Sequence, residues 1–199
     1  MALTADQVQK FYIGYYARPA DPVGLAYWQT QDEAAALKGF SESAEFTNQY
    51  QGLSASQQVT KVYNNLLGRA PDTAGLLYWA GELTAGRETI GSLVLSMTKN
   101  ALGKDVTTIE DRVSYSNSFT AALDTPAEIN AYAGAVATQA ARDALLKVVS
   151  NSVGDHTALN AEVMNIDATI AAIVAGGGAA PAQTFTLTTG VDFADVSGA

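Results

Sequence analysis

The chain contains no cysteine, a single histidine and few basic residues. The absence of cysteine excludes disulfides, zinc–thiolate sites and thiol nucleophiles. The one histidine, His156, leaves no room for a multi-histidine metal site. Eleven lysines and arginines stand against 20 aspartates and glutamates, which gives a net charge of −9 over 199 residues. This balance argues against a nucleic-acid partner, because neutralising phosphates requires clustered basic side chains, and the composition as a whole points away from an enzyme.

Long apolar runs are also missing. The N-terminus lacks the basic segment followed by an apolar one that marks a secretory signal peptide. The longest uncharged stretch, residues 168–191, is broken by three glycines and Pro181, and its second half is polar. A membrane-spanning helix needs about 20 mostly apolar residues, so we expect no transmembrane segment.

An internal repeat is the most secure feature of the sequence. Residues 12–28 (YIGYYARPADPVGLAYW) align without a gap on residues 63–79 (YNNLLGRAPDTAGLLYW), and seven of the 17 positions are identical. Upstream of each segment a hydroxyl residue stands three positions before a glutamine, which is the pattern of a helix capping box. A period of about 50 residues indicates a duplicated supersecondary unit, with copies at about 3–52 and 53–102.

Each copy predicts two helices joined by a short loop. Apolar residues at helical spacing place the first helix at about 5–17 and 55–67. The loop's aspartate is a natural N-cap for the second helix. Its arginine is placed to bond the preceding carbonyls or that aspartate, its glycine allows close approach of a backbone, and its tryptophan joins the core. These structural residues are Arg18, Asp21, Gly24 and Trp28 in the first copy, and Arg69, Asp72, Gly75 and Trp79 in the second.

The loop has two interpretations. Its arginine, aspartate and Tyr-Trp pair could grip a sugar, or the same residues could simply close the turn between two helices. We favour the second, because capping and core packing explain every shared residue. The differing positions are better ligand candidates, since the second copy replaces two tyrosines with leucines. The candidate glycan-binding residues are therefore Tyr15, Tyr16 and Arg18, although packing in a core or an interface remains the preferred explanation even for them.

The rest of the chain also predicts helices, followed by a change of structure. We expect a third helix in each copy, at 34–50 and 89–102. Beyond the repeat we expect further helices from 107, from 125, at 139–152 and at 157–175. The last carries an apolar seam, for a core or for an intermolecular helix contact. A glycine-rich linker at 176–183 and an alternating, strand-like segment at 184–189 then follow.

The predicted fold is therefore all-α, an array of about nine or ten helices with an internal duplication. Residues 1–103 form the duplicated helical domain, and 104–175 a helical continuation packed on it. Residues 176–199 form a linker and the start of a truncated β-rich region, because a lone strand cannot bury its faces. We interpret the chain as the N-terminal piece of a longer protein.

Few residues suggest chemistry. His156 has Asp155 beside it, but one adjacent pair does not define a catalytic arrangement, and an exposed residue in the first turn of the last helix is the simpler explanation. Glu42 and Glu45 are three apart on a predicted helix and could chelate a cation, although a solvated face is the preferred interpretation. Asp192 and Asp195 could begin calcium-binding repeats, but two carboxylates do not make a site.

The segment Asn65–Trp79 (NLLGRAPDTAGLLYW) resembles the signature LLGRxPDxxGLxYW of a bacterial family known only as a domain of unknown function. The family's later F-x-x-S-x-E-F pattern is matched by FSESAEF at 40–46. The first copy departs from the signature at Pro19-Ala20, and the second lacks the S-x-E-F end. The resemblance covers about residues 3–102. The segment ending at Asp192 resembles the join between such domains and calcium-binding RTX β-roll repeats.

This combination is similar to Gram-negative surface-layer proteins and other type I-secreted surface proteins. It implies an N-terminal, non-enzymatic module that anchors an extracellular lattice to lipopolysaccharide or another surface polysaccharide. Export would use a C-terminal signal, and calcium, if bound, would belong mainly to the missing β-roll. The alternative is a self-assembly module, a homo-oligomer whose helix faces make protein–protein contacts in a lattice or filament. A glycan-processing enzyme using Glu42 or Glu45 is a third, disfavoured class.

Overall fold

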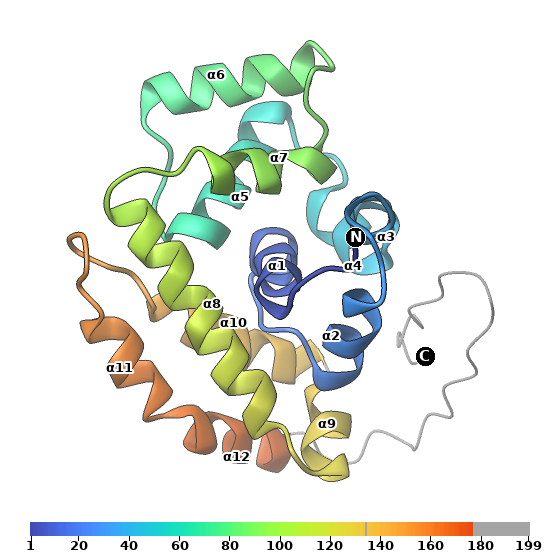
Figure 1. Ribbon diagram of the computed structural model, residues 1–199, viewed down its shortest axis with the longest axis vertical. Helices are drawn as coiled ribbons and strands as arrows, with labels where there is room; N and C mark the ends of the chain where they lie inside the picture. Colours follow the sequence, from blue (N-terminus) through green and yellow to red (C-terminus); the bar gives the residue numbers. More distant parts are fainter. Residues whose placement is uncertain (134, 177–199) are drawn as a thin grey trace.

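The computed structural model describes residues 1–133 and 135–176, and every regular element in these ranges is helical. The all-α class is therefore confirmed. The predicted linker beyond residue 176 and the strand at 184–189 lie outside the described residues. The elements, labelled in Figure 1, are α1 (Ala5–Phe11), the π-helical η1 (Tyr12–Tyr16), α2 (Pro22–Gln29), α3 (Glu33–Glu42), α4 (Ala44–Tyr50), α5 (Ala55–Leu67), α6 (Thr73–Thr84), α7 (Ile90–Lys99), α8 (Lys104–Ala122), α9 (Pro126–Tyr132), α10 (Ala135–Lys147), α11 (Thr157–Val163) and α12 (Ile166–Gly176).

Most helix starts follow the local capping chemistry that the sequence predicts. The aspartate N-caps, Asp21 and Asp72, accept a hydrogen bond from the backbone N–H three residues on, at 2.7 and 2.8 Å. Gly68 ends α5 in the left-handed conformation, with φ of 65°. Three of the expected capping boxes are present, at Thr4 and Gln7, Ser54 and Gln57, and Thr125 and Glu128.

The described residues form twelve α-helices rather than nine or ten, because two predicted helices are broken. Ser43 has an extended backbone between α3 and α4, and its Oγ accepts the N–H of Phe46 at 3.0 Å, so it caps a new helix. The predicted helix 157–175 divides at Met164 and Asn165. There the Asn165 side chain donates to the carbonyl of Ala161 at 2.9 Å and replaces a backbone bond.

Two other predicted boundaries were wrong. The helix expected from Thr107 begins earlier, at Lys104, because Gly103 (φ 60°) makes the turn into it. Thr107 instead lies buried inside α8, where its hydroxyl accepts the N–H of Gly154 at 3.2 Å. The helix expected at 139–152 is α10, which runs from Ala135 to Lys147, so the residues after it form a loop held against α8.

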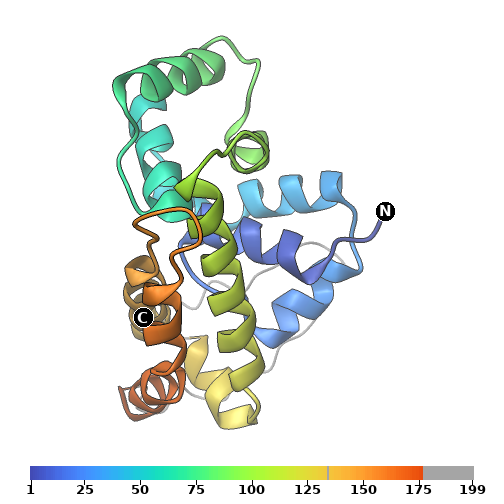
Figure 2. The same ribbon diagram turned by 60° about the vertical axis from the view of Figure 1, so that its left-hand side comes forward.

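Equivalent helices of the two copies pack against each other. The π-helical η1 contacts α5, and α3 contacts α7, while α2 packs on α1 and α6 packs on α5. Helix α8 then packs against both α1 and α5, and α9 to α12 pack around α8. Figures 1 and 2 both show α6 at one end of the molecule and α9 and α12 at the other. One apolar core runs from Leu3 to Ile173 through all of these layers.

No single helix within the described ranges is long and apolar enough to span a membrane. Helices α11 and α12 meet the length and composition requirement only when taken together, and they are bent by 48°.

A π-helical turn distinguishes the first copy from the second. Gly14 lies in the last turn of this π-helix, where carbonyls have no partner inside the helix. The carbonyl of Gly14 accepts from the hydroxyl of Tyr50 at 3.2 Å and from the side-chain amide of Asn65 at 2.9 Å. A Cβ at Gly14 would overlap Val94 of α7, so the copies meet at a position without a side chain.

Arg112, fully buried on α8, joins the ends of two helices. Its guanidinium donates to the carbonyls of Asn64 and Asn65 in the last turn of α5. It also donates to Val148 at 2.9 Å and Leu146 at 3.2 Å, at the end of α10. The last carbonyls of a helix have no partner inside that helix, and Arg112 supplies donors to both sets. Burial lowers the pKa of Arg112 to about 10, so it stays charged at neutral pH.

We expect Gly68→Ala to destabilise the protein by about 2–4 kcal/mol. A left-handed backbone costs an L-residue about 1 kcal/mol. The new methyl group would also overlap Val149 and lie 2.8 Å from Nη2 of Arg112, which adds about 1–3 kcal/mol of overpacking. Urea unfolding followed by circular dichroism measures the change.

Gly52→Ala is the matched control. Gly52 also has a positive φ, 78°, but nothing lies within 4 Å of its added Cβ, so only the backbone strain of about 1 kcal/mol applies. Equal losses for the two variants would contradict the crowding around Arg112.

Candidate functional site

The first copy closes its loop with an arginine held between a carboxylate and an aromatic ring. Arg18 donates two hydrogen bonds to Glu45, at 2.9 and 2.7 Å, and its guanidinium lies 5.1 Å from the centre of the Tyr12 ring. The Tyr12 hydroxyl fills the space where a Cβ on Gly24 would be. The glycine therefore makes room for a side chain, whereas the sequence suggested a backbone.

The second copy repeats this arrangement with another partner. Arg69 donates to both carboxylate oxygens of Asp105, at 3.0 and 2.6 Å, and lies over Tyr63 at 5.4 Å. Asp105 and Glu45 are each the second residue of a helix, α8 and α4, where the helix dipole favours a negative charge. Both arginines therefore bond a distant carboxylate, and the expected bonds to the capping aspartate or to the preceding helix's carbonyls are not their main contacts.

The Tyr-Trp pair of the motif divides between the interior and the surface. Trp28 and Trp79 are buried, which agrees with the core role predicted for them, whereas Tyr27 and Tyr78 are exposed. In each copy the two rings meet edge to face, with centroids 4.9 Å apart and planes at 75°. The motif thus presents a tyrosine to the outside at equivalent places of both copies.

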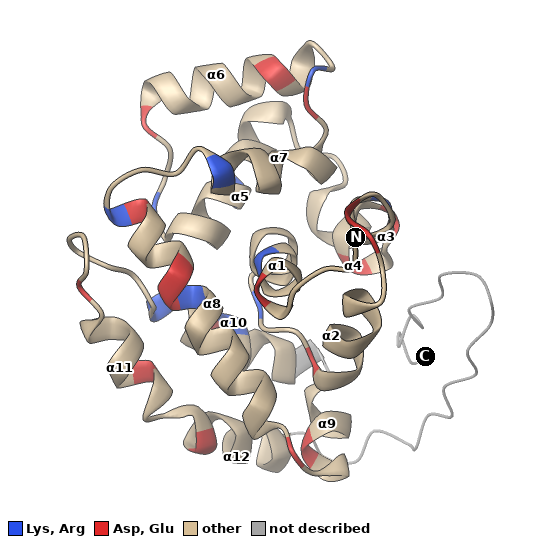
Figure 3. Ribbon diagram, in the orientation of Figure 1, with Lys and Arg blue, Asp and Glu red and all other residues tan. Residues whose placement is uncertain are grey.

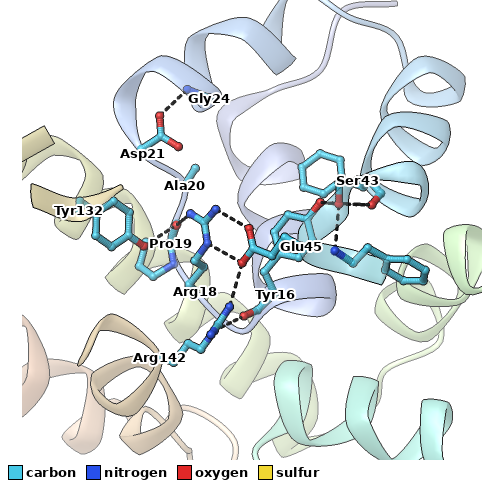
Figure 4. Close-up of polar contacts among 12 residues, drawn as sticks. Tyr16, Arg18, Pro19, Ala20, Asp21, Gly24, Ser43, Glu45, Tyr132 and Arg142 are labelled. Carbon is cyan, nitrogen blue, oxygen red and sulfur yellow. Dashed lines mark hydrogen bonds and ion pairs between the residues drawn. The ribbon is translucent and has the colours of Figure 1, made fainter. Parts of the chain in front are cut away.

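Glu45 is the centre of a polar cluster that joins the first copy to α10 (Figure 4). Besides Arg18 it accepts from Nη2 of Arg142 at 2.8 Å, and Nε of Arg142 donates to the carbonyl of Tyr16 at 2.8 Å. Burial opposes ionisation of Glu45, but the two arginines outweigh it and hold the carboxyl pKa below its usual value. Glu45 therefore does not lie on a solvated face, as the sequence suggested, while Glu42 is exposed.

Of the three candidate glycan-binding residues, the two tyrosines lie in the interior and Arg18 is 12% exposed. Tyr15 and Tyr16 are buried, and burial raises the pKa of both hydroxyls. The Tyr15 hydroxyl donates to the carbonyl of Gly91, and the Tyr16 hydroxyl lies 2.7 Å from Oγ of Ser43. Arg18 is occupied by Glu45. This placement supports packing rather than an exposed sugar platform. The second copy has leucines, also buried, at the places of the two tyrosines, and this substitution is what indicated in the sequence that the positions face the core.

A polar stripe along α5 lines a shallow hollow of 490 Å³ on the surface of the second copy. We call this hollow the α5 groove. Its sequence does not mark it as a site, because polar residues spaced three and four apart normally indicate the solvent face of a helix. Its one signal is that the stripe carries hydroxyls and amides but a single charge, that of Lys61. The lining residues are Leu53, Ser56, Gln57, Thr60, Lys61, Asn64 and Asn65.

The C-terminal part of the equivalent stripe in the first copy is covered. At an offset of 51, Gln9 and Ile13 replace Thr60 and Asn64, and both are buried. The Gln9 amide donates to Thr120 of α8 at 2.9 Å, which fixes that helix across the stripe. The open groove is therefore a property of the second copy and not of the repeat.

His156 bonds a carboxylate other than the neighbouring Asp155. Its side chain is 51% exposed, and its Nδ1 lies 2.6 Å from Oδ1 of the buried Asp111. The hydroxyl of Ser150 donates to the other oxygen of Asp111 at 3.0 Å. Serine and histidine thus share one carboxylate and do not form the direct pair that activates a nucleophile. Among the described residues, no group of three or more acidic or histidine side chains could hold a metal ion.

Comparison with known proteins identifies one segment of the chain. Residues 37–101 match a family model described as a domain of unknown function (DUF4214). The match begins in α3 of the first copy and ends just after α7 of the second, so it contains Asn65–Trp79. No curated protein and no solved structure gives a significant match.

We expect Glu45→Gln to cost about 2–4 kcal/mol at pH 7, since it leaves two arginines without their shared charge. In the folded protein the pKa of Glu45 lies below its unfolded value, which is near 4.5. The charge of Glu45 therefore stabilises the fold fully above pH 4.5, and this stabilisation is lost as the pH falls through the folded pKa. The difference between wild type and variant should therefore shrink in acid. Denaturant unfolding at pH 7 and at pH 3 measures both.

Glu42→Gln provides the control, three residues away on an exposed position. It should change the stability by less than about 0.5 kcal/mol at either pH. A pH-independent loss for Glu45→Gln would show that its charge does not stabilise the cluster.

Proposed function

We propose that the chain is a non-enzymatic anchoring module of a secreted, surface-layer or adhesin-like protein, and that it binds lipopolysaccharide or another cell-surface polysaccharide. The sequence resemblance to type I-secreted surface proteins motivates the proposal, including an extracellular location. The match to a domain of unknown function fits that resemblance but names no activity.

The groove along α5 is the observation that supports glycan binding best. Ser56 and Asn64 offer a hydroxyl and an amide, which both donate and accept hydrogen bonds as sugar hydroxyls do. The hydroxyl of Thr60 donates to the carbonyl of Ser56 at 2.8 Å and offers a ligand its acceptor lone pairs. Leu53 adds an apolar contact at one end. From Ser56 to Asn65 the helix rises about 13 Å, enough for a chain of sugars to lie along it. The polar, neutral lining suits a saccharide better than an apolar ligand.

Titration with purified lipopolysaccharide tests the proposal. We expect saturable binding that weakens about tenfold or more in Thr60→Val combined with Asn64→Ala, because each lost hydrogen bond is worth about 1 kcal/mol. Isothermal titration calorimetry gives the affinities. Asn160→Ala, at an exposed position of α11, is the control and should bind as the wild type does. Unaltered binding by the double variant would remove the groove from the site.

Self-assembly is a second candidate, supported by the outer faces of α2 and α6. Val23 and Tyr27 on α2 are exposed, as are Leu77 (69%) and Tyr78 (58%) on α6. Clusters of exposed apolar residues mark sites of protein association. The faces occupy equivalent places in the two copies, so one face could meet the other on a second copy of the chain, as a lattice requires.

Sedimentation over a range of protein concentrations tests self-assembly. The wild type should form oligomers as its concentration rises, and Leu77→Ser combined with Tyr78→Ser should shift the transition to at least tenfold higher concentration. Leu102→Ser changes an exposed leucine outside both faces and should have no effect. Oligomers in the wild type, with no lipopolysaccharide binding, would favour assembly over anchoring. A monomer at all concentrations would exclude this second function.

A further inference from the structure

We infer that the groove along α5 takes an acidic saccharide, and that Lys61 binds the carboxylate or phosphate group of that sugar. The inference rests on the proposed function and names the ligand class of the same site.

Lys61 makes no ion pair with a carboxylate among the described residues. The six ion pairs among the described residues do not include it. Its ammonium lies 5.5 Å from the centre of the Tyr50 ring, over the aromatic face. Burial removes part of the hydration that stabilises the lysine charge, and an anion that approaches from the open side stabilises that charge again. The groove supplies that open side.

The charges around Lys61 also favour an anion. Glu45 is the acidic residue of the neighbouring cluster, and Arg18 and Arg142 already bind both of its oxygens. Burial lowers the pKa of Lys61, and the positive charge of Arg142 lowers it further. The nearby charge that acts on Lys61 is therefore that of another cation, Arg142, although the net charge of the chain is −9. A ligand carboxylate or phosphate would restore the local balance.

The aromatic ring that Lys61 lies over is itself packed and hydrogen-bonded, so the cation is held in place before a ligand arrives. The Tyr50 ring stacks on Phe46 at 4.4 Å and 13°, and its hydroxyl bonds the carbonyl of Gly14. Asn65, at the other end of the lining, is buried and donates to the same carbonyl. Binding therefore orders little of the protein, and preorganisation of this kind raises affinity.

The acidic residues on the rest of the surface favour a short acidic sugar over a long polyanion as the ligand. Figure 3 shows acidic positions along α6, α8, α11 and α12, which repel an extended polyanion such as a nucleic acid. One lysine among hydroxyls and amides matches a saccharide that carries an acidic group on an otherwise neutral chain. The amides and hydroxyls bond the sugar ring, and the ammonium selects the acidic group.

Isothermal titration with defined sugars tests the inference. The probes are the trimer of galacturonic acid, its neutral methyl ester, and mannose 6-phosphate paired with mannose, so that carboxylate and phosphate are tested separately. We expect the wild type to bind at least one acidic probe ten times more tightly than its neutral counterpart at 20 mM salt. The preference should fall at 150 mM salt, because exposed charges are screened.

The variants separate a binding lysine from a structural one. Lys61→Gln should lose the preference for the acidic probe while nearly keeping the melting temperature, since it removes a half-buried cation that contacts the Tyr50 ring but has no carboxylate partner. Lys38→Gln removes the same charge at an exposed position of α3 and should keep the preference. Lys61→Arg should retain part of it.

Each outcome decides between the two claims. Wild type that binds lipopolysaccharide but does not prefer an acidic probe overturns this inference and leaves the anchoring proposal standing. The same holds for an acidic preference that survives in Lys61→Gln. Absence of binding to lipopolysaccharide and to all of the sugars overturns both.

Discussion

The fold depends on a buried positive charge whose hydrogen-bond partners are all carbonyl groups. Arg112 of α8 donates to the last turns of α5 and α10, where helices leave carbonyls unpaired and carry the negative end of their dipole. Without these donors both helix ends would be buried and unsatisfied. The same contact positions the C-terminal end of the α5 groove, because Asn64 and Asn65 supply two of the carbonyls. It also explains the glycine at position 68, where no side chain fits beside the guanidinium.

The two copies show how a duplicated unit can be joined to different neighbours. Each closes its loop with an arginine that bonds the carboxylate at the start of a helix. In the first copy that carboxylate is Glu45, which belongs to the same unit and also binds Arg142 of α10. In the second copy it is Asp105, the beginning of α8. The duplicated half is therefore tied to the rest of the chain at two places by the same chemistry.

Most residues that the two copies share point into the core. The residues that could contact a partner lie where the copies differ or on their outer faces. The tryptophans of the motif are buried in the core, its glycines make room for a tyrosine hydroxyl, and its arginines bond carboxylates. In the first copy α8 covers part of the corresponding stripe through Gln9, whereas the stripe on α5 stays open. The outward tyrosines Tyr27 and Tyr78 are the exception, since both copies present them. The scaffold is thus shared by the copies while the candidate glycan site belongs to one of them.

The sequence by itself determined the helical class, most of the capped helix starts and the buried tryptophans, because each depends on residues no more than about four positions apart or on a regular apolar spacing. It also showed the repeat directly, as identical residues at an offset of 51. Only the tertiary structure decided that Tyr15 and Tyr16 are interior, that Glu45 binds two arginines, and that His156 meets Asp111, 45 residues away. Such contacts form between helices whose relative placement depends on the packing of the whole core. The open groove beside Lys61 is of the same kind, since a polar helix face becomes a site only when the neighbouring helices leave it uncovered.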